Sequence, residues 1–244
     1  MNTVQHQEST AVKLENPAVE LFQQDWKIYR KLVENNYLFH TEAYDRLHTL
    51  LADTFSDPFS FLDIACGDAS AAVDALKGTQ VAWYYGVDLS RAALEVAGEN
   101  LKQLRCPMDL READLAAALR DWREPVDVVW IGLSLHHFGT GEKLELMREA
   151  RRIVGSDGLF AIYENASPDG EDRDGWLRRW DLQKPLWTAY SPEEWGIMQA
   201  HVRGNDFPET SSGWHALGRE AGFGEVREVY TAPSDLFRLY SFRA

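Results

Sequence analysis

Acidic and small residues follow an apolar run near position 60, in an order that suits the binding of a polar ligand. Asp63 ends the run, and Ala65, Gly67 and Asp68 lie in the loop before a predicted helix. Small residues let the backbone approach a ligand closely, and the free amides at the start of a helix can donate to its polar groups. These four residues are candidates for ligand binding, and an ordinary junction between strand and helix is the alternative.

Two further aspartates end the next two predicted strands. Asp88, followed by Leu89, ends the second strand, and a carboxylate there can accept hydrogen bonds from both hydroxyls of a ribose. Asp114, followed by Leu115, ends the third. The alternative for both aspartates is that each caps the helix that follows it.

A fourth segment combines a strongly apolar strand with polar residues at its carboxyl end. Leu133 and Ser134 lie near the end of the run 127–135, directly before His136 and His137. Adjacent side chains diverge, so a pair of histidines does not by itself predict a metal site, and we expect no bound metal. One imidazole of the pair could contact the substrate, and we take His137 as a catalytic candidate.

The segments that position these residues alternate between strand and helix. From residue 59 onward, short apolar runs alternate with amphipathic stretches, which predicts an α/β fold with a mostly parallel sheet and helices on both faces. We expect seven strands, the last two following a helical insertion at 165–222. Ligands bind at the carboxyl ends of such strands, so Glu164, at the end of the fifth, is a catalytic candidate, with a surface carboxylate as the alternative.

The order and spacing of the motifs between residues 59 and 164 resemble the class I S-adenosylmethionine (SAM)-dependent methyltransferases. Within that family they resemble the small-molecule enzymes related to quinone biosynthesis. The sequence departs from the family pattern at Ala65 and Ala69, where glycines are usual. The resemblance implies a Rossmann-like, doubly wound fold, with SAM as cofactor and in-line methyl transfer as the reaction.

The resemblance also implies roles for individual residues. Asp88 would bind the ribose of SAM, Asp114 the adenine amino group, and Leu133 and Ser134 the methionine part. The SAM-binding domain would span residues 56–244, including the insertion.

Residues outside the alternating core are expected to cover the cleft and to select the substrate. Residues 1–16 are expected to be flexible, and residues 17–55 to form N-terminal cap helices. Within the cap we expect Tyr29, Tyr37 and His40 to face the methionine end of SAM or the substrate, and packing between helices is the alternative.

The insertion supplies the candidate base. His201 or His215 could accept a proton, and we favour His201; solvent exposure is the alternative for both. Trp187 and Asp206 are further candidates, and a metal site of histidine and aspartate is not favoured here. An acidic protein with many aromatic residues suits a cationic acceptor, whereas Arg178 or Arg203 would suit a carboxylate.

The composition limits the partners. The formal net charge of −14 disfavours nucleic acid and anionic membranes, because like charges repel. Two cysteines in no metal or redox spacing, a polar start without a signal-peptide pattern and no long apolar run favour a cytoplasmic protein, either a monomer or a homodimer.

Other functions remain open. SAM could serve a different reaction, such as carboxy-SAM formation, or the chain could be a SAM-binding partner subunit without activity. Methylation of RNA or protein is disfavoured by the charge.

Overall fold

A twisted sheet of parallel strands forms the centre of the structure, which is a computed structural model that describes residues 26–243. The strand order is β3-β2-β1-β4-β5-β8-β7, and β8 runs antiparallel to both of its neighbours. The strands are β1 (Phe59–Ile64), β2 (Val81–Asp88), β3 (Met108–Glu112), β4 (Val128–Gly132), β5 (Leu159–Ser167), β7 (Glu225–Thr231) and β8 (Phe237–Arg243). This confirms the expected α/β fold with seven main strands.

One strand was not predicted. A short β6 (Glu209–Thr210) pairs with the end of β5 at Ala166 and Ser167. Two residues are too few to show an alternating pattern in the sequence, so only tertiary contacts define this strand.

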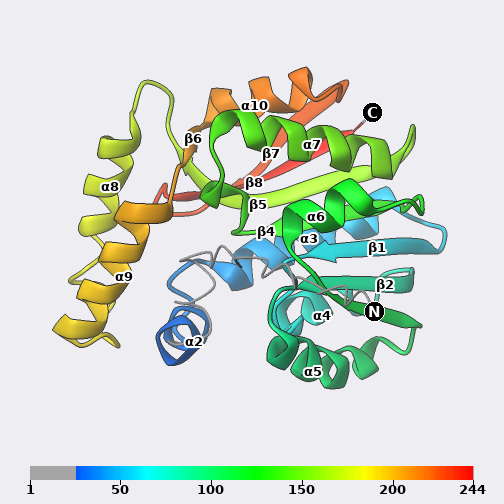
Figure 1. The fold of residues 1–244 in the computed structure, drawn as a ribbon, viewed down its shortest axis with the longest axis horizontal. Coiled ribbons are helices and arrows are strands. Elements are labelled where there is room, and N and C mark those ends of the chain that lie inside the picture. The colour runs from blue at the N-terminus through cyan, green and yellow to red at the C-terminus, as the bar shows by residue number, and fades with distance from the viewer. Residues whose placement is uncertain (1–25, 244) are drawn as a thin grey trace, which may run out of the picture.

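Helices cover both faces of the sheet (Figure 1). Their bounds are α2 (Trp26–Glu34), α3 (His40–Thr54), α4 (Ser70–Leu76), α5 (Arg91–Asn100), α6 (Leu115–Asp121), α7 (Thr140–Val154), α8 (Arg173–Asp181), α9 (Pro192–Asn205) and α10 (Ser211–Glu220), with the 3₁₀ turns η1 (Leu101–Leu104) and η2 (Leu135–His137). The cores on the two faces are separate: one contains side chains of α3, α4 and α5, the other those of α6, α7 and α10. The fold is therefore doubly wound, as expected.

Apolar patterning explains the central elements. Val128, Val129, Trp130 and Ile131 of β4 are fully buried, because a parallel strand in the middle of such a sheet is covered on both sides. Helix α7 buries an apolar stripe that includes Met147 and Ala150 and leaves its charged side in solvent.

The predicted insertion separates into two parts. Helices α8 and α9 lie beyond the sheet, next to α2 (Figure 1), and Lys31 of α2 forms an ion pair with Glu194 of α9 at 2.6 Å. Helix α10 instead packs on α7 and β7 and belongs to the helical layer on the sheet. Only α8 and α9 are thus placed to cover the cleft, and the prediction that all of 165–222 does so was too broad.

Four tryptophans bind α8 and α9 together. Trp180 lies 5.5 Å from Trp176 and 4.9 Å from Trp187 between ring centroids, and Trp187 lies 5.8 Å from Trp195. All four are buried, so this tryptophan cluster forms a small apolar core for the two helices.

Parts of the predicted N-terminal region lie outside the description. The flexible segment 1–16 and the first part of the cap helices, 17–25, lie outside the described residues, and so does the side chain of Tyr29. Within residues 26–243 no helix combines the length and apolar character needed to cross a membrane.

Candidate active site

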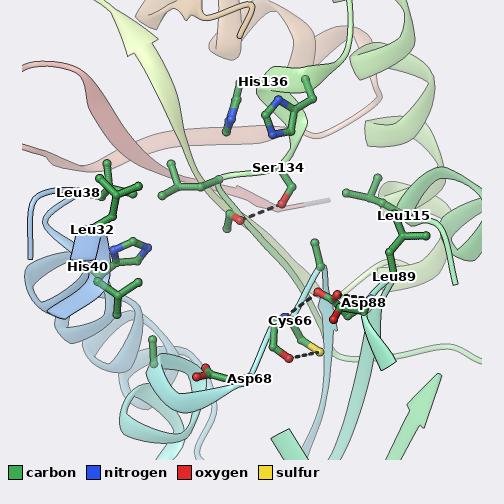
Figure 2. Close-up of a pocket in the computed structure, with 18 of the residues that line it drawn as sticks. Leu32, Leu38, His40, Cys66, Asp68, Asp88, Leu89, Leu115, Ser134 and His136 are labelled. Carbon is green, nitrogen blue, oxygen red and sulfur yellow. Dashed lines mark hydrogen bonds between the residues drawn. The ribbon is translucent and has the colours of Figure 1, made fainter. Parts of the chain in front are cut away.

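A pocket of about 470 Å³ lies at the carboxyl ends of the parallel strands. It opens where β1 and β4 are neighbours and their connections leave in opposite directions, which is the usual ligand position in a doubly wound sheet. Figure 2 shows Asp88, Leu89 and Leu115 on one side of the pocket, with Leu32, Leu38 and His40 of the N-terminal region facing them. The pocket therefore lies between the strand-end loops and the cap.

The loop after β1 has an unusual backbone. Ala65, Gly67 and Ala69 have φ values of 61°, 55° and 55°, in the left-handed region. Glycine adopts this conformation without strain, whereas alanine does not. The two alanines thus occupy positions whose backbone suits glycine. Ala65, Gly67 and Asp68, which the sequence suggested as ligand-binding residues, line the pocket, and so does Ala69.

Asp88 links this loop to the next one. Its two carboxylate oxygens accept the backbone N–H groups of Gly67 and Ser90, both at 2.8 Å. Burial raises the pKa of Asp88. Each carboxylate oxygen has a second lone pair, so these bonds leave acceptor capacity for a ligand in the pocket.

Asp114 caps the next helix, which was the alternative to ligand binding, and also lies at the pocket. Its Oδ1 accepts from the Ala117 amide at 3.0 Å and caps α6, while the residue also lines the pocket beside Leu115. Leu89, Leu133 and Ser134 line the pocket as well.

Asp63 does not line the pocket. It is 3% exposed, and its Oδ2 accepts a hydrogen bond from the Tyr84 hydroxyl at 2.7 Å. Burial raises its pKa to about 7. Asp63 therefore joins β1 to β2 through a buried hydrogen bond, and it is not among the residues that line the pocket.

The predicted cap residues His40 and Tyr37 have different environments. His40 lines the pocket, and burial lowers its pKa to about 4. Tyr37 instead stacks on Trp187, with ring centroids 5.1 Å apart, and its hydroxyl accepts from the Ala189 amide. Both Tyr37 and Trp187 join the N-terminal region to the insertion and do not line the pocket, which is the helix-packing alternative.

A group of histidines lies at the other end of the pocket, around Asp206, the residue that directly follows α9. The distances from Asp206 Oδ1 are 3.9 Å to His136 Nε2, 3.6 Å to His137 Nδ1 and 3.9 Å to His201 Nε2. All four residues line the pocket. Two segments far apart in sequence, η2 and α9, thus meet at this histidine cluster.

Burial controls the charge of these rings. It lowers the pKa of His201 to about 4 and, with the neighbouring His136 and His201, holds that of His137 well below its ordinary value. Burial also lowers the pKa of His136, but Asp206 and Glu164 outweigh it and the net shift is upward. At neutral pH, His137 and His201 are neutral and can accept a proton or donate a lone pair.

Glu164 corrects a prediction. It does not end β5 or face the pocket; it is fully buried within the strand. Its Oε1 accepts the amides of Ser134 and Leu135 at 2.8 and 2.6 Å, and its Oε2 contacts His136 Nδ1 at 2.7 Å. Glu164 is a positioning residue that holds the loop after β4.

The other substrate-side candidates lie elsewhere. His215 of α10 packs against Tyr240, with ring centroids 5.8 Å apart, and is absent from the pocket. Arg203 forms an ion pair with Asp181, and neither Arg203 nor Arg178 lines the pocket.

The structure also adds residues that the sequence did not single out. Cys66, Leu38, Tyr44, Met198 and Val202 line the pocket. Tyr44, Met198 and Val202 lie on helices and Leu38 in the turn before α3, and the position of these elements depends on tertiary contacts, so no local motif marks them.

Comparison with known proteins agrees with this architecture. Residues 61–158 match the family described as a methyltransferase domain. Magnesium protoporphyrin IX methyltransferase from Synechocystis PCC 6803 with bound SAM is 13% identical, with a TM-score of 0.63, over 96% of this chain and all (100%) of that one. The plantazolicin methyltransferase in complex with SAH is 16% identical, with a TM-score of 0.63, over 92% of this chain and 93% of that one.

A "possible exported protein" from Bordetella parapertussis is 20% identical, with a TM-score of 0.62, over 83% of this chain and 67% of that one. A search of curated protein sequences gives no match. The resemblance to quinone-biosynthesis enzymes stays a prediction. Residues 61–158 thus resemble a methyltransferase domain, and the chain shares its fold with methyltransferases whose structures contain SAM or SAH.

Proposed function

We propose that this protein transfers the methyl group of SAM to a small-molecule acceptor. The observation that carries the proposal is a single pocket with two different ends. One end is formed by the strand-end loops with Gly67, Asp88 and Asp114, and the other by the histidine cluster and the apolar side chains of α9. A cofactor and an acceptor can therefore lie in line within one cavity.

The strand-end loops suit the cofactor. The remaining lone pairs of Asp88 would accept the ribose hydroxyls, and Asp114 would accept the adenine amino group beside Leu115. The backbone between Ala65 and Gly67 leaves room for close approach of the ligand. Leu89 would pack on the adenosine, and Leu133 and Ser134 would lie along the methionine part.

The transfer itself needs alignment more than chemical assistance. A lone pair of the acceptor attacks the methyl carbon, the bond from carbon to sulfur breaks, and its electrons stay on sulfur, which leaves S-adenosylhomocysteine. An acceptor that carries a proton must also lose it. His201 and His137, both neutral at neutral pH, are the bases that we propose. The enclosing helices exclude water from the attack line.

The shape of the site favours a small acceptor. Trp180, Met198 and Val202 of the insertion and Ile28 and Leu32 of α2 also line the pocket. Such a lining fits a compact, partly apolar molecule better than a nucleic acid strand, and the net charge of −14 points the same way.

Calorimetric titration with SAM tests the proposal. We expect binding by the wild-type chain and a loss of at least about tenfold in affinity for Asp88→Ala, because two charge-assisted hydrogen bonds are removed. Asp74→Ala is the matched control, since Asp74 is exposed on α4 and, among residues 26–243, forms an ion pair with Lys77 alone. Absence of SAM binding by the folded wild-type protein would overturn the cofactor assignment.

A screen with methyl-labelled SAM and pooled metabolites then tests the reaction. The mass of the product separates methyl transfer from carboxymethyl transfer. SAM binding without turnover of any small molecule would favour the partner-subunit alternative.

A further inference from the structure

A buried carboxylate oxygen without a hydrogen bond lies in the histidine cluster. Asp206 is 4% exposed, and its Oδ2 accepts from the Asn165 side chain at 2.9 Å. Its Oδ1 has no hydrogen-bond partner among the described residues. Buried carboxylate oxygens almost always have a hydrogen-bond donor or a cation as partner. Within residues 26–243 the Oδ1 atom of Asp206 has neither, which points to a missing partner such as a bound cation.

The atoms around this oxygen have the spacing of metal ligands. One ligand atom from each of His136, His137 and Asp206 lies within 4.8 Å of the others. Around a metal with bonds of about 2.0–2.2 Å, neighbouring ligand atoms lie about 3–3.5 Å apart. The separations of 3.6 and 3.9 Å from Asp206 Oδ1 to the two rings exceed that by only a few tenths of an ångström.

We propose that His136, His137 and Asp206 bind a divalent transition-metal ion such as Zn²⁺ at the acceptor end of the pocket. Two imidazoles and one carboxylate form a ligand set that suits transition metals better than Mg²⁺ or Ca²⁺, which prefer oxygen ligands. This differs from the expectation of no metal, which rested on the divergence of adjacent histidines and disfavoured a site of histidine and aspartate in the insertion. It was Asp206, 69 residues after His137 in the sequence, that completed the set.

The residues that contact the proposed ligands from behind hold them as residues around known metal sites do. Glu164 Oε2 lies 2.7 Å from His136 Nδ1, so that nitrogen donates its proton to the carboxylate and Nε2 presents a lone pair toward Asp206. A carboxylate behind a histidine ligand fixes the ring in this way at many metal sites. Asn165 holds Asp206 in the same manner, and it follows Glu164 on β5.

An imidazolium at His136 between two carboxylates is the metal-free alternative. It would draw Asp206 into a direct charge-assisted hydrogen bond of about 2.7–2.9 Å. The distance from His136 Nε2 to Asp206 Oδ1 is 3.9 Å, which is too long for such a bond and leaves a gap. His137 would give up a weak contact, 3.3 Å from its Nδ1 to the Asn205 carbonyl, on binding the metal.

Three protein ligands leave open coordination positions toward the pocket. An oxygen or nitrogen of the acceptor could occupy one of them, which would make the substrate class a metal-binding small molecule; this role rests on the proposed function. His201 would then remain as the base, because His137 would be a ligand. The metal site itself can be tested without SAM or an acceptor.

The test is titration of the full chain, after treatment with a chelator, with Zn²⁺ by calorimetry and with Co²⁺ by visible absorption. We expect one equivalent of each to bind, with a Co²⁺ spectrum typical of nitrogen and oxygen ligands. Mg²⁺ in large excess should not displace them. His136→Gln and Asp206→Asn should each weaken Zn²⁺ binding by at least about tenfold.

His215→Gln is the matched control, since His215 lies outside the pocket and its loss should leave Zn²⁺ binding unchanged. Circular dichroism checks that the variants are folded, and His137→Gln replaces any variant that is not. Absence of stoichiometric binding by the folded wild type, or equal binding by the ligand variants and the control, would overturn the assignment. A failure of SAM binding in the separate titration would leave this result unaffected.

Discussion

Replacing Ala65 by glycine should stabilise the fold. The φ of 61° at Ala65 places an L-residue in a region that costs about 1–2 kcal/mol. Glycine adopts it freely but loses about 0.5–1 kcal/mol more in backbone entropy on folding. The difference predicts that Ala65→Gly raises the free energy of unfolding by about 0.5–1 kcal/mol.

The neighbouring Ala69 gives an internal comparison. Its φ of 55° is equally strained, but its methyl group is 2% exposed and packs in the core beside α4. Loss of a buried methyl group costs about 0.8 kcal/mol, which cancels most of the gain. We therefore expect Ala69→Gly to be nearly neutral, although the backbone argument is the same.

Urea denaturation at equilibrium measures both changes, from shifts of the midpoint at a constant slope. Ala117→Gly is the control, because Ala117 is exposed in α6 and a glycine there should destabilise by about 0.5–1 kcal/mol. If Ala65→Gly destabilised the protein as much as this control does, the left-handed backbone would carry no strain. SAM affinity should not fall, since the substitution removes only a methyl group from the pocket wall.

Three further predictions concern the polar residues. Glu164→Gln should lower the free energy of unfolding by about 2–4 kcal/mol in thermal or urea unfolding, because an amide cannot accept from all of the partners of Glu164; an effect below about 0.5 kcal/mol would contradict its positioning role. His201→Gln should lower kcat about 10²-fold or more for a protonated acceptor without changing the SAM Kd, and an unchanged kcat would remove His201 as the base. The pKa values of His40 and His201 are about 4 in the fold, against about 6.5 in an unfolded chain, so the unfolded state binds more protons between these values. The contribution of these two histidines to the stability of the metal-free protein should therefore be complete above about pH 6.5 and be lost as the pH falls toward 4. Buried carboxyl groups such as Asp63 contribute in the opposite direction, so the measurement is the difference between variants: urea midpoints should fall less, or rise more, for His40→Leu than for the wild type over this range.

Local patterns predicted several of the strand-end residues that line the pocket. The strand ends at Asp88 and Asp114, and the loop around Gly67, lie where alternating βα units must bring them, because parallel strands place all their carboxyl ends at one edge. The buried roles of Asp63 and Glu164 could not be read in the same way. A carboxylate at a strand end has the same sequence pattern whether it faces the pocket or the residues beneath it.

The acceptor side depended on tertiary structure. His136 and Asp206 meet only because α9 docks beside the loop after β4, and no spacing in the sequence encodes that contact. The same holds for Tyr37, whose stacking on Trp187 joins the turn after α2 to the insertion. The sequence suggested most of these residues as functional or packing candidates, but it did not show which of them lie in contact in the fold.

The tryptophan cluster of α8 and α9 can report on the pocket through its intrinsic fluorescence. Trp180 lies in the pocket wall and is 4.9 Å from Trp187, close enough for excitation energy to pass between the indole rings. An acceptor or a metal ion that settles at this end of the pocket should quench or shift the emission of the whole group. Binding can therefore be followed in real time without a label, and Trp180→Phe would show how much of the signal originates at the wall.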